Sequence, residues 1–276
     1  MMGAALRTEY RKLVTTRMWW ILLLTMAAYM AFLAAIMAFV LTEGAAGGAG
    51  TFTGDGAQPA VPLSPERVAQ TVYTLATSLG YVFPVIVGAL AMTGEFRHQT
   101  ITPTLLAEPR RTVVLTAKML SSVVVGLVFG VVGTLATVAA GAGTLALLGQ
   151  DPGLGEPIVL RSAALSVLAL TVWTVVGVGF GTLITNQVAV IVVLLAFTQF
   201  VEPILRLVLA QLDWAQGVSK FLPGAAGESI TGASFYADSG IGADLLSSWE
   251  GFAVLLGYAV VFAVAGRLTS LRRDIT

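Results

Sequence analysis

The chain has 276 residues, of which 57% are hydrophobic and 11% are charged, and its formal net charge is zero. A soluble protein carries about a quarter charged residues, so the composition predicts an all-α integral membrane protein, and the zero net charge argues against a nucleic-acid partner. The absence of cysteine excludes disulfides and thiolate chemistry, and the single histidine excludes zinc motifs such as H-E-x-x-H.

The N-terminal residues 1–17 place apolar and basic side chains on separate helical stripes. This pattern predicts an amphipathic helix in the cytoplasmic membrane interface, which either anchors the chain to lipid or also contacts a cytoplasmic partner. The apolar run that follows carries Trp19 and Trp20, which are typical of an aromatic belt. It is longer than the about 7–15 residues of a signal-peptide core, so we interpret it as a retained span. A cleavable signal that ends near 45–50 is the alternative.

A membrane-crossing helix needs about 20 apolar residues. The uncharged runs predict six such helices within one transmembrane domain that covers 18–276. These spans lie near 18–41, 68–93, 119–147, 162–184, 188–209 and 251–271. Two G-x-x-x-G patterns, at 126–130 and 177–181, predict close helix contacts, and the glycines at 141 and 143 predict a break or an end of the third span.

The basic residues gather on one side of the predicted spans. By the positive-inside rule, this distribution places both termini and the connection 94–118 in the cytoplasm. The basic residues on that side are Arg7, Arg11, Lys12, Arg17, Arg97, Arg110, Arg111, Lys118, Arg267, Arg272 and Arg273. On the opposite side, the segment 210–250 mixes aromatic and acidic residues, and we expect it to form an outer gate, or lid, of short helices.

The candidate gate or path residues fall into two groups. Glu202 and Arg206 lie inside the fifth predicted span, and their spacing puts them on one helical face. Ionisable residues at membrane depth are functional candidates, so we weigh a gate or cargo role against a self-paired couple at a water-filled outer vestibule. Glu95, Arg97 and His98 either take part in a gate or only end the second span.

The connection 94–118 concentrates charge and proline in an otherwise apolar sequence. Thr102 followed by Pro103 is a favourable helix start, and Pro109 is expected to stop the helix, so the pattern predicts a short helix at 102–108. A helix of this length is not stable alone in water. It must therefore pack against its own protein or against a cytoplasmic partner.

Two charged stretches carry a more specific pattern. The first comprises Gly94-Glu95-Phe96-Arg97-His98-Gln99-Thr100, Thr102-Pro103-Thr104-Leu105-Leu106-Ala107, Pro109-Arg110-Arg111 and Lys118. The second comprises Glu9-Tyr10-Arg11-Lys12-Leu13 and Thr15-Thr16-Arg17. Together they resemble the corresponding stretches of ABC type-2 exporter permeases, most closely bacterial members of the drug- and sodium-export kind. The resemblance covers the whole chain in span count and orientation, whereas the specific motifs cover only these stretches.

The resemblance implies a dimer of six-span subunits, formed with a second permease copy or a paralogue, in a bacterial cytoplasmic membrane. It also implies two copies of a soluble ABC ATPase, on which the helix at 102–108 docks as the coupling helix while the N-terminal helix flanks the same ATPase. The implied docking residues are Thr102, Pro103, Thr104, Leu105, Leu106, Glu108, Arg110 and Arg111.

The chain carries no recognisable catalytic motif of its own. None of its lysines follows a glycine, so the phosphate-binding pattern G-x-x-x-x-G-K-[ST] is missing. We expect no cofactor in this chain, with ATP and magnesium bound by the partner. The sequence therefore predicts a permease subunit that exports an apolar or amphipathic cargo. The alternatives are a motor-independent transporter or channel and a non-transporting membrane scaffold.

Overall fold

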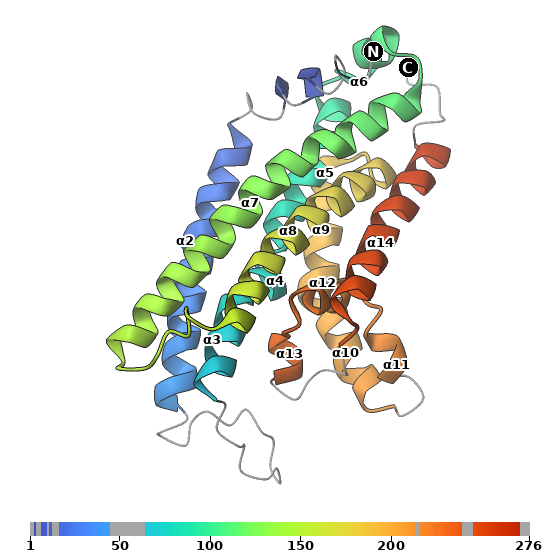
Figure 1. Ribbon diagram of the computed structural model, residues 1–276. Coiled ribbons are helices and arrows are strands. Elements are labelled where there is room, and N and C mark those ends of the chain that lie inside the picture. Colours follow the sequence, from blue (N-terminus) through green and yellow to red (C-terminus); the bar gives the residue numbers. More distant parts are fainter. Residues whose placement is uncertain are drawn as a thin grey trace.

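In a computed structural model of the chain, the described residues are 3, 7–9, 11, 12, 17–44, 64–212, 216–238 and 245–270. All the regular structure of these residues is helical, without a strand. The long helices run alongside one another, and short helices gather at the end opposite α6 (Ile101–Ala107) (Figure 1). The predicted all-α fold is confirmed.

Five helices of the described chain are long and apolar enough to cross a membrane. They match the first, third, fourth, fifth and sixth predicted spans. They are α2 (Met18–Phe39) with the π-helical turn η1 (Val40–Gly44), α7 (Arg111–Leu147), α8 (Pro157–Leu183), α9 (Gln187–Ala196) with η2 (Phe197–Val201) and α10 (Glu202–Ala210), and α14 (Ser248–Thr269). The start of α2 and the end of α14 lie at the same end of the molecule as α6 (Figure 1).

The second predicted span is broken into three helices, α3 (Pro65–Tyr73), α4 (Leu75–Ser78) and α5 (Val82–Arg97). The series begins at Ser64, whose hydroxyl accepts a hydrogen bond from the Arg67 amide. At Gly80, an added Cβ would lie 2.7 Å from the Ala76 carbonyl oxygen, so the turn between α4 and α5 needs a glycine. None of the three helices alone reaches the length of a span, so the count of six stays a prediction.

The third span, α7, is 37 residues long and begins at Arg111, earlier than predicted. At about 1.5 Å per residue it is about 55 Å long, longer than the about 30 Å of a bilayer core. The prediction that the glycines near its end would break the span is wrong. An added Cβ at Gly141 would lie 2.6 Å from a methyl group of Val72 on α3, so this glycine allows close packing between α7 and α3.

The central helix of the bundle is α8, which packs against α5, α7 and α14. Glycines bring the backbones together: a Cβ at Gly177 of α8 would lie 2.1 Å from the Val85 carbonyl oxygen of α5. A Cβ at Gly126 of α7 would lie 3.0 Å from the Thr171 carbonyl oxygen of α8. The close helix contacts predicted from the two glycine patterns are therefore present.

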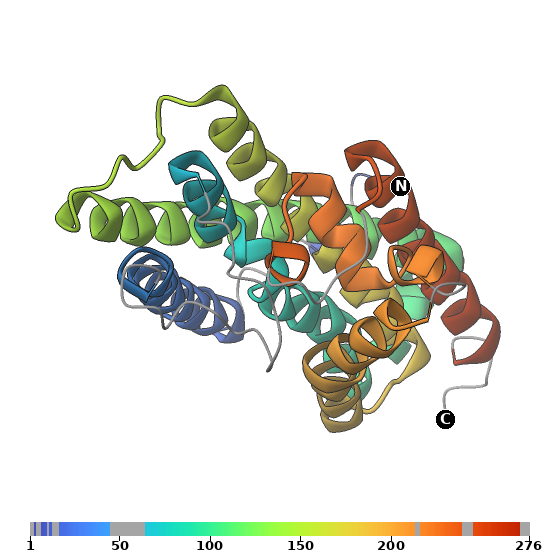
Figure 2. The same ribbon diagram turned by 90° about the horizontal axis from the view of Figure 1, so that it is seen from below.

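The segment at 210–250 contains short helices, α11 (Gln216–Ser219), α12 (Pro223–Thr231) and α13 (Phe235–Asp238). Figure 2 looks onto this end of the molecule and shows these helices gathered near α10 and α14. Every residue of α12 is buried. The helix begins with proline at its first position and ends at Gly232, which has the left-handed φ of 73°. The predicted short helices are present, whereas 213–215 and 239–244 lie outside the described residues.

Candidate functional site

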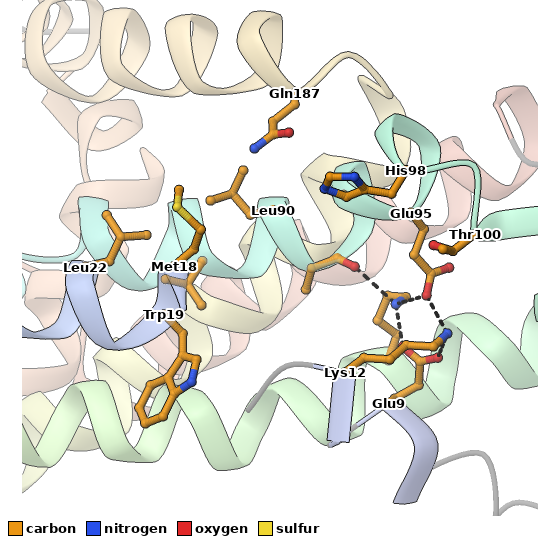
Figure 3. Close-up of a pocket in the computed structure, with 14 residues that line it drawn as sticks. Glu9, Lys12, Met18, Trp19, Leu22, Leu90, Glu95, His98, Thr100 and Gln187 are labelled. Atoms are coloured by element: carbon orange, nitrogen blue, oxygen red, sulfur yellow. Dashed lines mark hydrogen bonds and ion pairs between the residues drawn. The ribbon is translucent and has the colours of Figure 1, made fainter. Parts of the chain in front are cut away.

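Four charged side chains meet near α6 and form what we call the inner ion network, which consists of Glu9, Lys12, Glu95 and Lys118 (Figure 3). The Lys12 ammonium nitrogen lies 2.9 Å from Glu9 Oε1 and 2.8 Å from Glu95 Oε1. The Lys118 ammonium nitrogen lies 3.0 Å from Glu95 Oε1 and also pairs with Glu9 Oε2. The network therefore joins the N-terminal residues to α5 and α7.

The charges of the inner ion network balance, with two ammonium groups and two carboxylates. Lys118 is 2% exposed, and it also donates a hydrogen bond of 3.1 Å to the Ala91 carbonyl. Burial opposes ionisation of Glu9, but Lys118 and Lys12 hold the pKa of this carboxyl below its ordinary value. Burial likewise opposes the charge of Lys12, and Glu95 and Glu9 raise its pKa above the ordinary value.

The predicted amphipathic helix at 1–17 is described only in part. Residues 3, 7–9, 11 and 12 are helical, and Glu9 is 4% exposed because it packs into the inner ion network. The other residues before Arg17 lie outside the described part of the chain. The placement of this segment in the membrane interface stays a prediction.

The short helix predicted at 102–108 is present as α6, but it begins one residue earlier than expected. Thr100 occupies the N-cap position, so the prediction that the helix starts at Thr102 is wrong. The turn before α6 contains Gln99 with φ of 55°, and the Thr100 amide donates to the Glu95 carbonyl. This turn directs the chain back toward the bundle and fixes where α6 begins.

Two apolar side chains of α6 pack against the bundle, whereas a third, Leu106, is exposed. Ile101 is 2% exposed and belongs to a buried cluster that includes Met92, and Leu105 packs against this cluster. Leu106 is 78% exposed. Thr104 accepts a 3.0 Å hydrogen bond from Lys12, so the inner ion network also holds α6.

The remaining predicted docking residues surround α6. Thr102 and Pro103 are exposed at its first turn. Glu108 follows the helix in an extended conformation, and the Arg110 guanidinium lies 2.8 Å from its carboxylate. This pair holds the pKa of Glu108 below its ordinary value. Arg111 begins α7 and is half-buried.

The three candidate gate residues at the end of α5 make different contacts, although Glu95 and His98 line the same cavity. Glu95 belongs to the inner ion network, and Arg97 donates a 2.9 Å hydrogen bond to Gln187 at the start of α9. His98 lines a cavity of about 400 Å³ between the N-terminal residues, α2, α5 and α9 (Figure 3). The wall of this cavity is largely apolar and includes Met18, Trp19, Leu22, Val87 and Leu90.

The second pair of candidate residues lies near the opposite end, beneath the short helices. The Arg206 guanidinium lies 2.9 Å from Glu202 Oε1 and 2.8 Å from Glu228 Oε2 of α12. We call Glu202, Arg206 and Glu228 the outer ion cluster. The sequence-based prediction found Glu202 and Arg206 by their spacing but missed Glu228. The only feature of the sequence that singles out Glu228 is that it is an acidic residue among mostly small and apolar residues.

Within the described residues, no group of three or more His, Asp or Glu side chains is placed to hold a metal ion. A π-helical turn, η2, directly precedes Glu202. Such turns are frequent at functional sites.

Comparison with known proteins supplies the identity of the chain. A search of curated proteins finds no match. A family model described as ABC-2 family transporter protein matches residues 4–275. This match includes the inner ion network, α6, all five long helices and the outer ion cluster. The chain therefore belongs to the ABC-2 family of transporter proteins and is a membrane transport component.

Proposed function

We propose that the chain is the membrane subunit of an ATP-driven exporter, which moves an apolar or amphipathic cargo outward with ATP hydrolysed by a separate ABC ATPase. Membership of the ABC-2 family supports this proposal. In the proposed complex, ATP and magnesium bind to two ATPase subunits. The permease pairs with a second copy or a paralogue in a bacterial cytoplasmic membrane, with its termini and α6 on the cytoplasmic side.

The observation that carries the proposal is the exposed Leu106 on an otherwise anchored helix. A helix of seven residues is held by tertiary contacts rather than by its own stability. Ile101 and Lys12 provide such contacts, and they fix α6 so that Leu106 points away from the chain's own core. An apolar side chain presented on a fixed short helix is suited to insert into a pocket of a soluble partner.

The inner ion network provides a route by which movement of α6 reaches the membrane. Lys12 contacts Thr104 of α6 and Glu95 of α5, and Lys118 of α7 pairs with the same Glu95. Displacement of α6 by a closing ATPase would therefore carry the ends of α5 and α7 together. Since α7 is one continuous helix of 37 residues, the movement would reach its far end without a hinge.

The cavity near His98 suits the cargo class that we propose. Its apolar wall lies beside polar groups, which are His98, Thr100, Gln187 and the four charged side chains of the inner ion network (Figure 3). An amphipathic molecule from the inner leaflet could place its apolar part against Met18, Leu22 and Leu90. Cavities of this size that combine an apolar wall with convergent polar groups are typical small-molecule sites.

Co-purification with the ATPase tests the docking role of α6. We expect the wild-type chain to retain a soluble ABC ATPase, and Leu106→Asp to lose it, because a carboxylate would be desolvated in the contact. Leu147→Asp is the matched control, since Leu147 is 89% exposed at the other end of α7. An ATPase that stays bound to the Leu106→Asp variant would contradict the proposal.

A further inference from the structure

The outer ion cluster is buried but its charges do not balance. Glu202 is 1% exposed, Arg206 5% and Glu228 1%. Both carboxyl groups share the one guanidinium of Arg206. If both were ionised, the cluster would carry one uncompensated negative charge in a site closed to water, whereas the inner ion network has two cations for two carboxylates.

An uncompensated buried charge is costly, and such a group normally gains a proton instead. The other titratable groups that face the cluster cannot supply a positive charge, because they are phenols. They come from the residue before α5, from α13 and from α14, and they are Tyr81, Tyr236 and Tyr258. The central helix α8 contributes Trp173, which does not titrate.

Within the part of the chain that the structure describes, each of the two carboxyl groups has one buried oxygen without a hydrogen-bond partner, Glu202 Oε2 and Glu228 Oε1, and the bonds at the other oxygen distinguish the two groups. Glu202 Oε1 accepts from Arg206 Nη2 at 2.9 Å, from Arg206 Nε at 3.3 Å and from the Ala225 amide at 3.1 Å. The last donor belongs to the first turn of α12, where the helix dipole favours an anion. Glu202 is therefore well stabilised as a carboxylate.

Glu228 has a different environment in the second turn of α12. Its Oε2 accepts from Arg206 and from the Ser234 hydroxyl. Its Oε1 is buried and has no hydrogen-bond partner in the described structure, and neither has the hydroxyl of Ser78, which lies beside Glu228. A proton on Oε1 would convert this atom into a donor toward the Ser78 hydroxyl without disturbing the two bonds at Oε2.

We propose that Glu228 is a proton-binding site of the outer lid, occupied by one proton when α12 is packed against α10. The proton makes the outer ion cluster neutral, with Arg206 compensated by Glu202. Gly224 allows this packing, since an added Cβ there would lie 2.5 Å from Glu202 Oε1 and 2.6 Å from Arg206 Nη2.

The bound proton makes the position of α12 depend on the pH outside the membrane. When Glu228 loses its proton, the buried cluster gains a net negative charge, and separation of α12 from α10 lets water reach that charge. One linked proton changes the ratio of separated to packed lids by about tenfold per pH unit, between the pH at which Glu228 of a separated lid loses its proton and the higher pH at which Glu228 of a packed lid loses it. High pH therefore favours the separated lid.

Infrared spectroscopy of the reconstituted chain tests the proton directly. We expect the carbonyl stretch of a protonated carboxylic acid at neutral pH in the wild type and its loss in Glu228→Gln. Glu202→Gln should lose the band as well, because Glu228 is then the only carboxylate left to compensate Arg206. Ser78→Ala should keep the band but shift its frequency, because the proton on Glu228 then loses its neighbouring hydroxyl. Glu156→Gln, at the start of α8, is a control that should also retain the band. A band that persists in Glu228→Gln or in Glu202→Gln, or whose frequency is unchanged in Ser78→Ala, would overturn the assignment.

Thiol labelling tests the link between the proton and the lid. The chain has no native cysteine, so Ala233→Cys, at a position that is 1% exposed between α12 and α13, gives a single buried reporter. The labelling rate of this cysteine is divided by that of the exposed control Gln150→Cys, because the division cancels the effect of pH on thiol ionisation. We expect this ratio to rise with pH. The ratio should not depend on pH when Glu228→Gln is added, because glutamine mimics the protonated acid.

If the labelling ratio depends on pH in the same way with and without Glu228→Gln, the proposal is overturned. Circular dichroism of each variant identifies those that fail to fold, and the pH titration of the infrared band in the wild type remains decisive in that case. Neither measurement requires the ATPase. If the infrared and labelling results support the proton site but no ATPase binds, only the proposed exporter function is refuted. If an ATPase binds but the infrared and labelling results are negative, only the proton site is refuted.

Discussion

At the residue scale, Lys118 shows how much of the end of the molecule near α6 depends on one buried charge. Its ammonium group pairs with Glu9 and Glu95 at 2% exposure. Lys118→Met would keep the length of the side chain but leave these carboxylates with fewer cations. Removing one partner from a buried ion pair costs about 3–5 kcal/mol, so we expect a clear drop in thermal stability of the purified protein.

The control for this prediction is Lys220→Met, because Lys220 lies over the Phe221 ring outside the inner ion network. Its effect should stay within about 0.5 kcal/mol. Adding Glu95→Gln to Lys118→Met should recover part of the loss, since it removes one of the unpaired charges. Equal stability of the two lysine variants would show that the inner ion network contributes little.

The pKa directions of Glu9 and Lys12 predict the pH range over which the network holds. The pKa of Glu9 is lowered from 4.5, so its contribution to stability is complete above that value and is lost as the pH falls through the lowered pKa. The pKa of Lys12 is raised from 10.5, so its contribution is complete below that value and is lost at higher pH.

We therefore expect the stability contributed by the inner ion network to be constant between these values and to fall in acid. Thermal unfolding at a series of pH values measures this, and Glu9→Gln should flatten the acid side of the profile. An unchanged acid dependence in Glu9→Gln would mean that other carboxyl groups control it.

The residue scale also shows where sequence-based prediction succeeded and failed. Glu202 and Arg206 were found together because they are four positions apart on one helix. Glu228 pairs with the same Arg206 from 22 positions away. Its role depends on α12 folding back onto α10, which no local pattern of the sequence specifies.

At the element scale, the contact between α5 and α8 depends on glycine. A Cβ at Gly177 would lie 2.1 Å from the backbone oxygen of Val85, so Gly177→Val must push the two helices apart. Overpacking of this kind costs about 1–3 kcal/mol or more, and we expect a lower melting temperature and poorer yield of folded protein. Gly257→Val on α14 is the control, because no atom lies within 4 Å of its added Cβ.

A melting temperature of Gly177→Val equal to that of Gly257→Val would contradict the close packing of α5 and α8. The comparison is informative because both substitutions add the same side chain to a long helix. They differ in whether another helix backbone occupies the space.

Hydropathy predicted the long helices well because apolar composition is what makes a helix span a membrane. It could not predict how the second span divides into α3, α4 and α5, since the tight turn at Gly80 depends on neighbours such as Met30 of α2. It also misplaced the start of α6 by one residue. The turn at Gln99 and the packing of Ile101 decide that start, rather than the Thr102-Pro103 signal.

At the scale of the whole molecule, the two ionic sites lie at opposite ends of one bundle. The inner ion network connects the N-terminal residues, α5, α6 and α7, and the outer ion cluster connects α10 to α12. Between them, α8 packs against α5, α7, α12 and α14. In our account, α6 receives the movement of the ATPase, the bundle transmits it, and the release of α12 opens the path outward.

Site-specific photo-crosslinking at Leu106 in the native membrane is the most direct test of whether α6 docks on a soluble ABC ATPase. The account predicts that a photoreactive residue at this position crosslinks to a soluble ABC ATPase, and that the same residue at Leu147 does not. Crosslinks from Leu106 only to lipid or to the chain itself, in membranes that contain the ATPase, would contradict the account.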